Sequence, residues 1–258
     1  ALAPYRFRAW GAIADLDICA KSPRIRANGL LENNTKNIFS APPIRYNSHM
    51  TKEKAARVLD ALEELYPDAR AELNFRNPFE TLIATILSAQ CTDRRVNMVT
   101  ERLFARYPDA QSLALVSQED LEEQIRECGL YRMKAKNIRA ACQALVAEYG
   151  GEVPASREAL MKLPGVGQKT AGVVLLAAFG GDEIPVDTHV RRVSNRIGLA
   201  RGDAPEKVEE QLRALLARER WSHAHHLLIW HGRRMCTARA PRCESCPLAD
   251  ELCENREK

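Results

Sequence analysis

The sequence predicts an all-α protein with about ten helices. Apolar residues recur at helical spacing in most segments after residue 50, and no segment shows sustained alternation of period two. No internal repeat of about 30 residues is visible. The 258 residues suffice for one large domain or two modest ones. No apolar run approaches the roughly 18 residues that a membrane span requires.

The first two expected helices have clear start signals. The first covers residues 51–66, with Thr51 as its N-cap. The second covers residues 78–88, with Asn77 as its N-cap and Glu80 at the capping-box position. This second helix is apolar on nearly every face, which places it at the centre of a core.

Eight more helices are expected beyond residue 90. Their ranges are 96–107, 118–128, 134–149, 156–162, 170–179, 190–197, 206–216 and 224–232. Gly129 ends the second of these and Gly150 the third, because glycine commonly follows a helix C-terminus.

Residues 1–49 are expected to be a disordered extension without a catalytic role. They mix prolines and asparagines with isolated apolar residues. They hold seven Lys and Arg against three acidic residues, which accounts for the whole net charge of +4. A transit peptide, a basic arm that contacts DNA and an upstream translation start are the alternatives. Any nucleic-acid-binding face elsewhere must come from local clustering of charge.

The turn Pro164-Gly165-Val166-Gly167 separates two of the expected helices. Proline lacks an N–H donor and the glycines free the backbone, so this stretch cannot lie inside a helix. Unpaired N–H groups at the start of the next helix could bind phosphate. Lys169 lies in the first turn of that helix, near the positive end of the helix dipole. Alone, these features favour an ordinary turn beside a solvated lysine.

Four cysteines gather in one short stretch near the C-terminus: Cys236, Cys243, Cys246 and Cys253. Their clustering predicts a metal site in a reducing compartment. Both tetrahedral zinc and a [4Fe–4S] cluster fit four thiolates from one loop. Zinc usually takes two closely spaced pairs, and only Cys243 and Cys246 form one, so the spacing favours iron–sulfur.

The remaining cysteines and the clustered histidines are expected to be structural. Three cysteines in helical patterns are expected to be buried: Cys91, Cys128 and Cys142. The histidines His223, His225 and His226 lack the i, i+4 spacing of a metal site. Because His226 and His231 flank an apolar run, core or capping histidines are expected here.

Two motifs resemble the endonuclease III family of DNA glycosylases. The string L-P-G-V-G-Q-K-T-A at 163–171, followed by V-D-T-H at 186–189, is similar to the helix-hairpin-helix of that family. The spacing C-x6-C-x2-C-x6-C resembles its iron–sulfur loop, although the family commonly has five residues in the last interval. The resemblance extends from about residue 50 to residue 258. It implies a [4Fe–4S] cluster, with the extra residue absorbed as a bulge.

The resemblance also implies two lobes with a DNA cleft between them. The first would be a six-helix barrel over residues 71–181. The second would be an iron–sulfur lobe made of residues 50–70 and 182–258. Lys169 would enter the cleft from the barrel and Asp187 from the iron–sulfur lobe.

The resemblance assigns roles to individual residues. It implies that Lys169 is the nucleophile and Asp187 its catalytic partner. Gln90 would fill the gap left by an extruded nucleotide, Leu130 would wedge the opposite strand, and Asp93 would support the cleft. Without the resemblance, Gln90 and Leu130 are a polar loop residue and a helix-stop residue. Backbone or charged contact with phosphate is expected of these residues: Gly165, Gly167, Lys134, Lys136, and the arginines Arg233, Arg234, Arg239 and Arg242 near the cysteines.

The implied function is base-excision repair of oxidised pyrimidines by a bifunctional N-glycosylase and abasic-site lyase. The enzyme would cut 3′ to the lesion through a lysine Schiff base. The expected partner is duplex DNA with damaged bases or abasic sites. We expect a monomer in the bacterial cytoplasm, associated with the nucleoid and with no membrane.

Three alternative functions compete with this one. The adenine-mismatch branch generally lacks the lysine and carries a glutamate in its central helix, whereas residues 82–90 contain no acid. A thymine or uracil mismatch glycosylase of the same superfamily stays open. Retention of Lys169 and Asp187 argues against a non-catalytic DNA-binding iron–sulfur protein.

Overall fold

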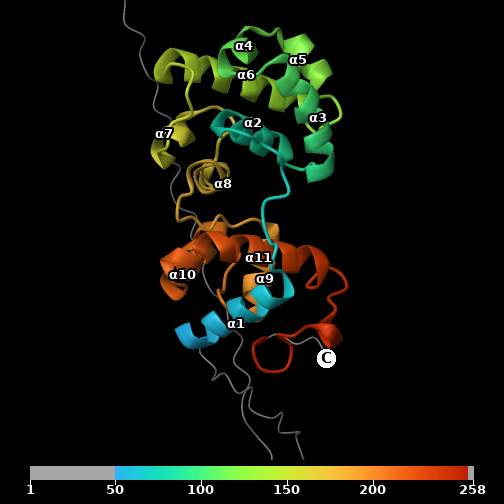
Figure 1. Ribbon diagram of the computed structural model, residues 1–258, viewed down its shortest axis with the longest axis vertical. Coiled ribbons are helices and arrows are strands. Elements are labelled where there is room, and N and C mark those ends of the chain that lie inside the picture. The colour runs from blue at the N-terminus through green and yellow to red at the C-terminus, as the bar shows by residue number, and fades with distance from the viewer. Residues whose placement is uncertain (1–49, 255–258) are drawn as a thin grey trace, which may run out of the picture. The chain divides into compact units, whose positions relative to one another are not determined.

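The predicted all-α class is confirmed for the part of the chain that the structure describes. The computed structural model describes residues 50–254, which hold eleven α-helices, two short 3-10 helices and no strand (Figure 1). The extension expected over residues 1–49 lies outside the described residues. Across residues 50–254, no helix combines the length and apolarity that a membrane span needs.

The α-helices are α1 (Lys52–Leu65), α2 (Pro78–Ser88), α3 (Asp93–Arg106), α4 (Ala110–Leu115), α5 (Gln118–Gln124), α6 (Tyr131–Tyr149), α7 (Arg157–Lys162), α8 (Gln168–Phe179), α9 (Thr188–Ile197), α10 (Pro205–Leu215) and α11 (Trp221–Arg234). The 3-10 helices are η1 (Arg218–Arg220) and η2 (Cys243–Ser245).

An additional helix, α4, and the end of α5 correct the sequence prediction. Helix α4 was not expected, because its six residues are too few for a periodic pattern to show. A reciprocal capping box starts it, in which the Asp109 carboxylate accepts from the Ser112 N–H at 2.8 Å. Helix α5 ends at Gln124, so Gly129 is not its stop. The residues after α5 form turns, and Ile125 in these turns is fully buried.

The expected N-caps of α1 and α2 are confirmed. The Thr51 hydroxyl accepts from the Lys54 N–H at 3.1 Å, and the Asn77 side chain accepts from the Glu80 N–H at 2.8 Å. The capping box expected at Glu80 is wrong. Its buried carboxylate instead accepts from the backbone N–H of Arg76 and pairs with the Arg76 guanidinium, both at 2.7 Å.

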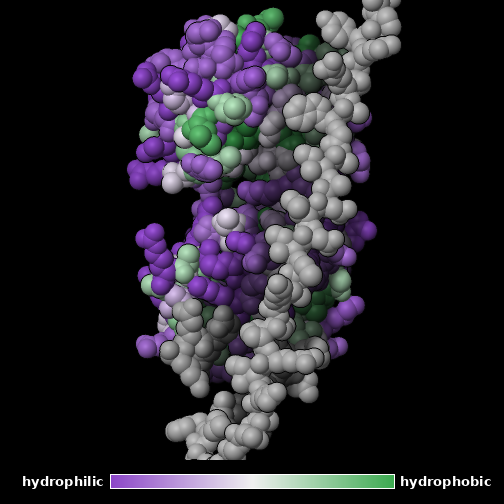
Figure 2. All heavy atoms as spheres, turned by 180° about the vertical axis from the view of Figure 1, so that it is seen from behind, coloured by the Kyte–Doolittle hydropathy of each residue, from purple (hydrophilic) through white to green (hydrophobic). Residues whose placement is uncertain are grey.

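Two separate clusters of buried apolar side chains hold the helices together. Residues of α2 to α8 form the first, and Leu82, Ile83 and Leu87 show why α2 lies at its centre, since all three are fully buried. Residues of α1, α9, α10 and α11 form the second. Figure 1 shows the same grouping, and the face in Figure 2 is mainly hydrophilic, because most large apolar side chains are internal. The two cores support the predicted lobes, which we retain as a proposal.

The predicted burial of cysteines holds for two of three. Cys128 and Cys142 are fully buried, and burial raises the pKa of each thiol to about 12. Cys91 lies in a bend after α2 and is only half-buried, so the expectation for it is wrong. Helix α2 ends at Ser88 and Gln90 has a left-handed backbone with φ +52°, so Cys91 leaves the helical pattern that would have buried it.

Candidate active site

The turn between α7 and α8 has the geometry that its glycines predict. Gly165 has φ +80°, and a Cβ atom there would lie 2.8 Å from the Cβ of Asn137. Val166 is buried and its N–H donates to the Leu163 carbonyl at 3.1 Å, which ties the turn to the core. Gly167 is the N-cap of α8 and provides no side chain to cap it. The first N–H groups of α8 are therefore open to an anion.

Lys169 is the second residue of α8 and is exposed, as its position in the motif predicts. The rest of α8 is anchored in the first core through Ala171, Val174 and Leu175. A flexible amine thus extends from a rigid helix.

Asp187 is the N-cap of α9. One carboxylate oxygen, Oδ1, accepts from the N–H groups of His189 at 2.8 Å and Val190 at 2.7 Å. Helix α9 therefore begins at Thr188, two residues earlier than expected. An aspartate directly before a helical pattern is a common start signal, so the sequence contained this information. The capping bonds hold the half-buried carboxylate in one orientation.

One cleft of about 860 Å³ brings together five of the predicted site residues: Gln90, Asp93, Gly167, Lys169 and Asp187. Lys169 and Asp187 also line a smaller cavity whose wall includes His225 and Trp230 of α11. Three predicted residues are not among those that line the cleft: Leu130, Gly165 and Arg234. The lysine of α8 and the aspartate of α9 therefore face the same space.

Gln90 and Leu130 share an unusual backbone conformation. They have φ +52° and +58°, and no other non-glycine residue of the described chain has positive φ. Both side chains are exposed. A Cβ atom on Gly129 would lie 3.2 Å from the Gln90 carbonyl oxygen, so the two loops touch. Left-handed backbone costs free energy at such residues and is concentrated at functional sites.

Lys134 corrects one expectation about phosphate contact. Its side chain is 4% exposed and donates from Nζ to the carbonyl oxygen of Leu87 at 2.8 Å. Burial lowers the pKa of its amine. The lysine satisfies the C-terminal end of α2, directly before the loop that carries Gln90, and is not available to a phosphate group.

Arg233 was expected beside the cysteines, but it lines the cleft. Its guanidinium pairs with Asp93 at 2.7 Å and also with Glu72. Arg234 lies elsewhere, with its guanidinium 3.6 Å from the centre of the Trp230 ring. A phosphate contact by Arg234 stays a prediction.

The cysteine loop encloses a separate cavity. All four of its cysteines line that cavity and none of them forms a disulfide. Although no three such side chains within residues 50–254 are placed to hold a single metal ion, the four soft donors face one space. This donor set fits an iron–sulfur cluster.

Two arginines of α9 hold the cysteine loop, and neither was predicted to do so. Arg192 donates to the Cys236 carbonyl at 3.3 Å, and Arg196 donates to the Thr237 carbonyl at 2.7 Å. Arg196 also approaches the sulfur of Cys236 at 3.5 Å. In the sequence, Arg192 and Arg196 are four residues apart and lie opposite the apolar face of α9. This spacing is the sequence feature that could have indicated their shared role.

Two models of known protein families match this chain. Residues 83–218 match the model of the HhH-GPD superfamily of base excision DNA repair proteins, and residues 236–253 match the iron–sulfur binding domain of endonuclease III. The chain is 48% identical over 203 residues to endonuclease III of Synechocystis sp., covering 78% of this chain and 92% of that protein. It is 46% identical over 209 residues to endonuclease III of Escherichia coli K12, covering 81% and 99%.

The chain belongs to the endonuclease III family. A solved non-covalent endonuclease III–DNA complex has a TM-score of 0.76 and 51% identity, covering 79% of this chain and 95% of that one. A thermostable thymine-DNA glycosylase has a TM-score of 0.70 at 26% identity, covering 81% and 99%.

Membership in the endonuclease III family confirms several sequence predictions. The chain is a base-excision repair enzyme, with DNA glycosylase and abasic-site lyase activity. The match to the iron–sulfur domain confirms a [4Fe–4S] cluster over zinc. The non-catalytic and mismatch alternatives are therefore less favoured than the main interpretation.

His225 is buried, as predicted. It is 3% exposed, and its Nδ1–H donates to the Pro185 carbonyl at 2.9 Å. Burial lowers the pKa of His225 to about 3 and that of His226 to about 4. Both rings stay neutral, and His225 supports the segment that enters α9 through its bond to Pro185.

Proposed function

We propose that Lys169 is the nucleophile and Asp187 its catalytic partner in the removal of oxidised pyrimidines from duplex DNA. The observation that carries this proposal is that both side chains line one cleft, beside an uncapped helix N-terminus and Gln90. A cleft that holds an amine, a carboxylate and an anion site suits attack on a sugar within a phosphate backbone.

Lys169 carries the covalent chemistry in this proposal. Its neutral amine attacks C1′ of an extruded nucleotide, and the bond from C1′ to the damaged base breaks. Loss of the amine protons and opening of the sugar ring leave an imine between Nζ and C1′. The imine makes the C2′ proton acidic, so its removal expels the 3′ phosphate and cuts the strand. Water then hydrolyses the imine and frees the lysine. Only a nitrogen nucleophile forms such an imine.

Asp187 stabilises the positive charge that develops on the sugar as the base leaves. Its carboxylate is already oriented by two backbone N–H groups of α9, so little reorganisation accompanies the reaction. It also assists proton removal from the Lys169 amine.

The DNA contacts follow from the loops and the helix terminus. The first N–H groups of α8, together with those of Gly165 and Gly167, bind a phosphate group. Gln90 fills the gap in the stack and Leu130 wedges the opposite strand, since both are exposed on loops that touch. Asp93 supports the cleft by holding Arg233, and Arg234 contacts the backbone.

The four cysteines of the loop would hold the [4Fe–4S] cluster. When bound, the cluster joins four points of a loop that has little regular structure of its own. Arg192 and Arg196 keep that loop against α9. We further propose that the enzyme acts as a monomer, in the bacterial cytoplasm and at the nucleoid.

Borohydride trapping tests the proposed chemistry. The wild-type protein is mixed with a duplex that contains one thymine glycol, and Lys169→Ala is treated in parallel, with an undamaged duplex as control. We expect a covalent protein–DNA adduct with the wild type alone and only on the damaged duplex. Base release without an adduct would indicate a monofunctional glycosylase that uses water. An equal adduct with Lys169→Ala would assign the nucleophile elsewhere.

A further inference from the structure

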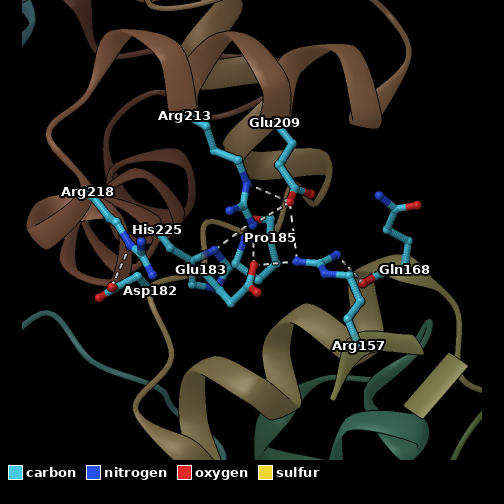
Figure 3. A network of polar contacts seen from close by, with 9 residues as sticks. All are labelled: Arg157, Gln168, Asp182, Glu183, Pro185, Glu209, Arg213, Arg218 and His225. Carbon is cyan, nitrogen blue, oxygen red and sulfur yellow. Dashed lines mark hydrogen bonds and ion pairs between the residues drawn. The ribbon is translucent and has the colours of Figure 1, made fainter. Parts of the chain in front are cut away.

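Four charged side chains form a network beside the cleft (Figure 3). Arg157 is the first residue of α7, Glu183 lies between α8 and α9, and Glu209 and Arg213 belong to α10. The Glu183 carboxylate pairs with both arginines. The Glu209 carboxylate also pairs with both, at 3.4 Å to Arg157 and 2.8 Å to Arg213.

The network is more than a set of surface ion pairs. Its side chains retain 21%, 14%, 11% and 28% of their exposure, in the order Arg157, Glu183, Glu209, Arg213. Each carboxylate pairs with both guanidinium groups, so positive and negative groups alternate around the network. Removal of one partner from such a partly buried network leaves an uncompensated charge. The four groups should therefore keep a single arrangement.

Arg157 also lies against α8 beside Lys169. Its Nη1 lies 3.5 Å from the carbonyl oxygen of Gln168, the residue before Lys169 (Figure 3). Its Nη2 lies 3.4 Å from the position of a Cβ atom on Gly172. The guanidinium thus lies against the first turn of the helix that presents the amine.

Glu183 connects the same network to the segment that ends at Asp187. Two residues after it, Pro185 packs on α8, with its ring 3.1 Å from the Cβ position of Gly172. The Pro185 carbonyl accepts from buried His225 of α11 at 2.9 Å (Figure 3). The approach to Asp187 is therefore held by α7, α8, α10 and α11.

We infer that Arg157 and Glu183 are positioning residues, which set the placement of the Lys169 amine relative to the Asp187 carboxylate. This inference rests on the proposed function of those two groups. Neither Arg157 nor Glu183 lines the cleft, so they act only through the elements that they join. A misplacement of about 1 Å between reacting groups can reduce a rate by roughly a hundredfold.

The test separates the rate of reaction from the affinity for DNA. For Arg157→Gln, we expect single-turnover borohydride trapping to slow by about tenfold or more. The Kd for a duplex with an uncleavable tetrahydrofuran abasic analogue should stay within about twofold, since no phosphate contact is removed. Glu183→Gln should behave in the same way, and Arg157→Lys should recover part of the rate because it keeps the charge.

Arg218→Gln is the matched control. Arg218 pairs at 2.8 Å with Asp182, the residue next to Glu183. The Arg218 side chain, however, is 73% exposed. This variant should leave both the trapping rate and the affinity within about twofold of wild type, as expected for an exposed pair.

Three outcomes would overturn the inference. Trapping at the wild-type rate by Arg157→Gln would reject the inference, provided that circular dichroism shows the variant to be folded. If Arg157→Gln does not fold, wild-type trapping by folded Glu183→Gln would reject it in the same way. A parallel loss of rate and affinity would show that the network supports DNA binding instead. Absence of an adduct with the wild-type protein would reject the proposed function and this inference together, whereas the first two outcomes reject the inference alone.

Discussion

At the scale of single residues, Asp187 combines a structural and a proposed chemical task. Its Oδ1 caps α9 through two hydrogen bonds, while the residue lines the cleft with Lys169. Asparagine caps helices about as well as aspartate but carries no charge. The two tasks can therefore be separated by substitution.

Asp187→Asn should slow borohydride trapping by about a hundredfold or more, because the positive charge on the sugar loses its stabilising carboxylate. Its free energy of unfolding, measured with urea, should change by less than about 0.5 kcal/mol. Asp187→Ala should lose the same activity and also about 1 kcal/mol of stability, because the cap is removed. Wild-type trapping by Asp187→Asn would assign the residue a capping role alone.

At the scale of elements, the hairpin of α7 and α8 depends on one glycine more than on the other. Gly165 needs positive φ and has Asn137 against it, whereas Gly167 has an ordinary φ of −93° and no atom within 4 Å of a Cβ position. The two glycines of one motif thus have different physical requirements.

Gly165→Ala should lower the free energy of unfolding by about 1–3 kcal/mol, because the added Cβ strains the backbone and meets Asn137. Gly167→Ala should cost less than about 1 kcal/mol, since only the N-cap preference changes. Urea unfolding of the two variants beside the wild type makes the comparison. Equal losses would show that the turn responds to chain entropy and not to left-handed strain.

At the scale of the whole molecule, one buried and one half-buried histidine, both neutral, make stability depend on pH. His225 contacts the Pro185 carbonyl, and its charge environment includes His226, Asp187 and Lys169; His226 is also influenced by His223. Burial dominates and lowers the pKa of His225 to about 3 and of His226 to about 4. In the unfolded chain both pKa values return to about 6.5.

The unfolded chain therefore binds protons between about pH 6.5 and 4 that the folded protein does not bind. Stability should be unaffected by these groups above about pH 6.5, and should fall as the pH decreases, by roughly 1 kcal/mol per pH unit for each histidine. Urea unfolding of the holoenzyme at pH 7.5, 6.5 and 5.5 measures this slope. His225→Gln should reduce the slope between pH 6.5 and 5.5, and an unchanged slope would contradict the assignment.

What the sequence alone determined is local or carried by motifs. The caps at Thr51 and Asn77, the hairpin and the cysteine loop all depend on residues that lie a few positions apart, so the pattern itself encodes them. The family resemblance rested on the same short strings. The fold class followed from the helical spacing of apolar residues, and the cofactor followed from the cysteine loop and the family resemblance.

What only the tertiary structure decided is pairing across long distances in the chain. Lys134 turns inward to Leu87, Arg233 faces the cleft, and the left-handed backbone of Gln90 and Leu130 arises where two loops meet. Arg157 and Glu183 are 26 residues apart, and Arg192 and Cys236 are 44 apart. Such partners are chosen by the packing of two cores, because a charged side chain binds whichever group burial brings near it. The periodic pattern of the sequence does not encode which of these residues will pair.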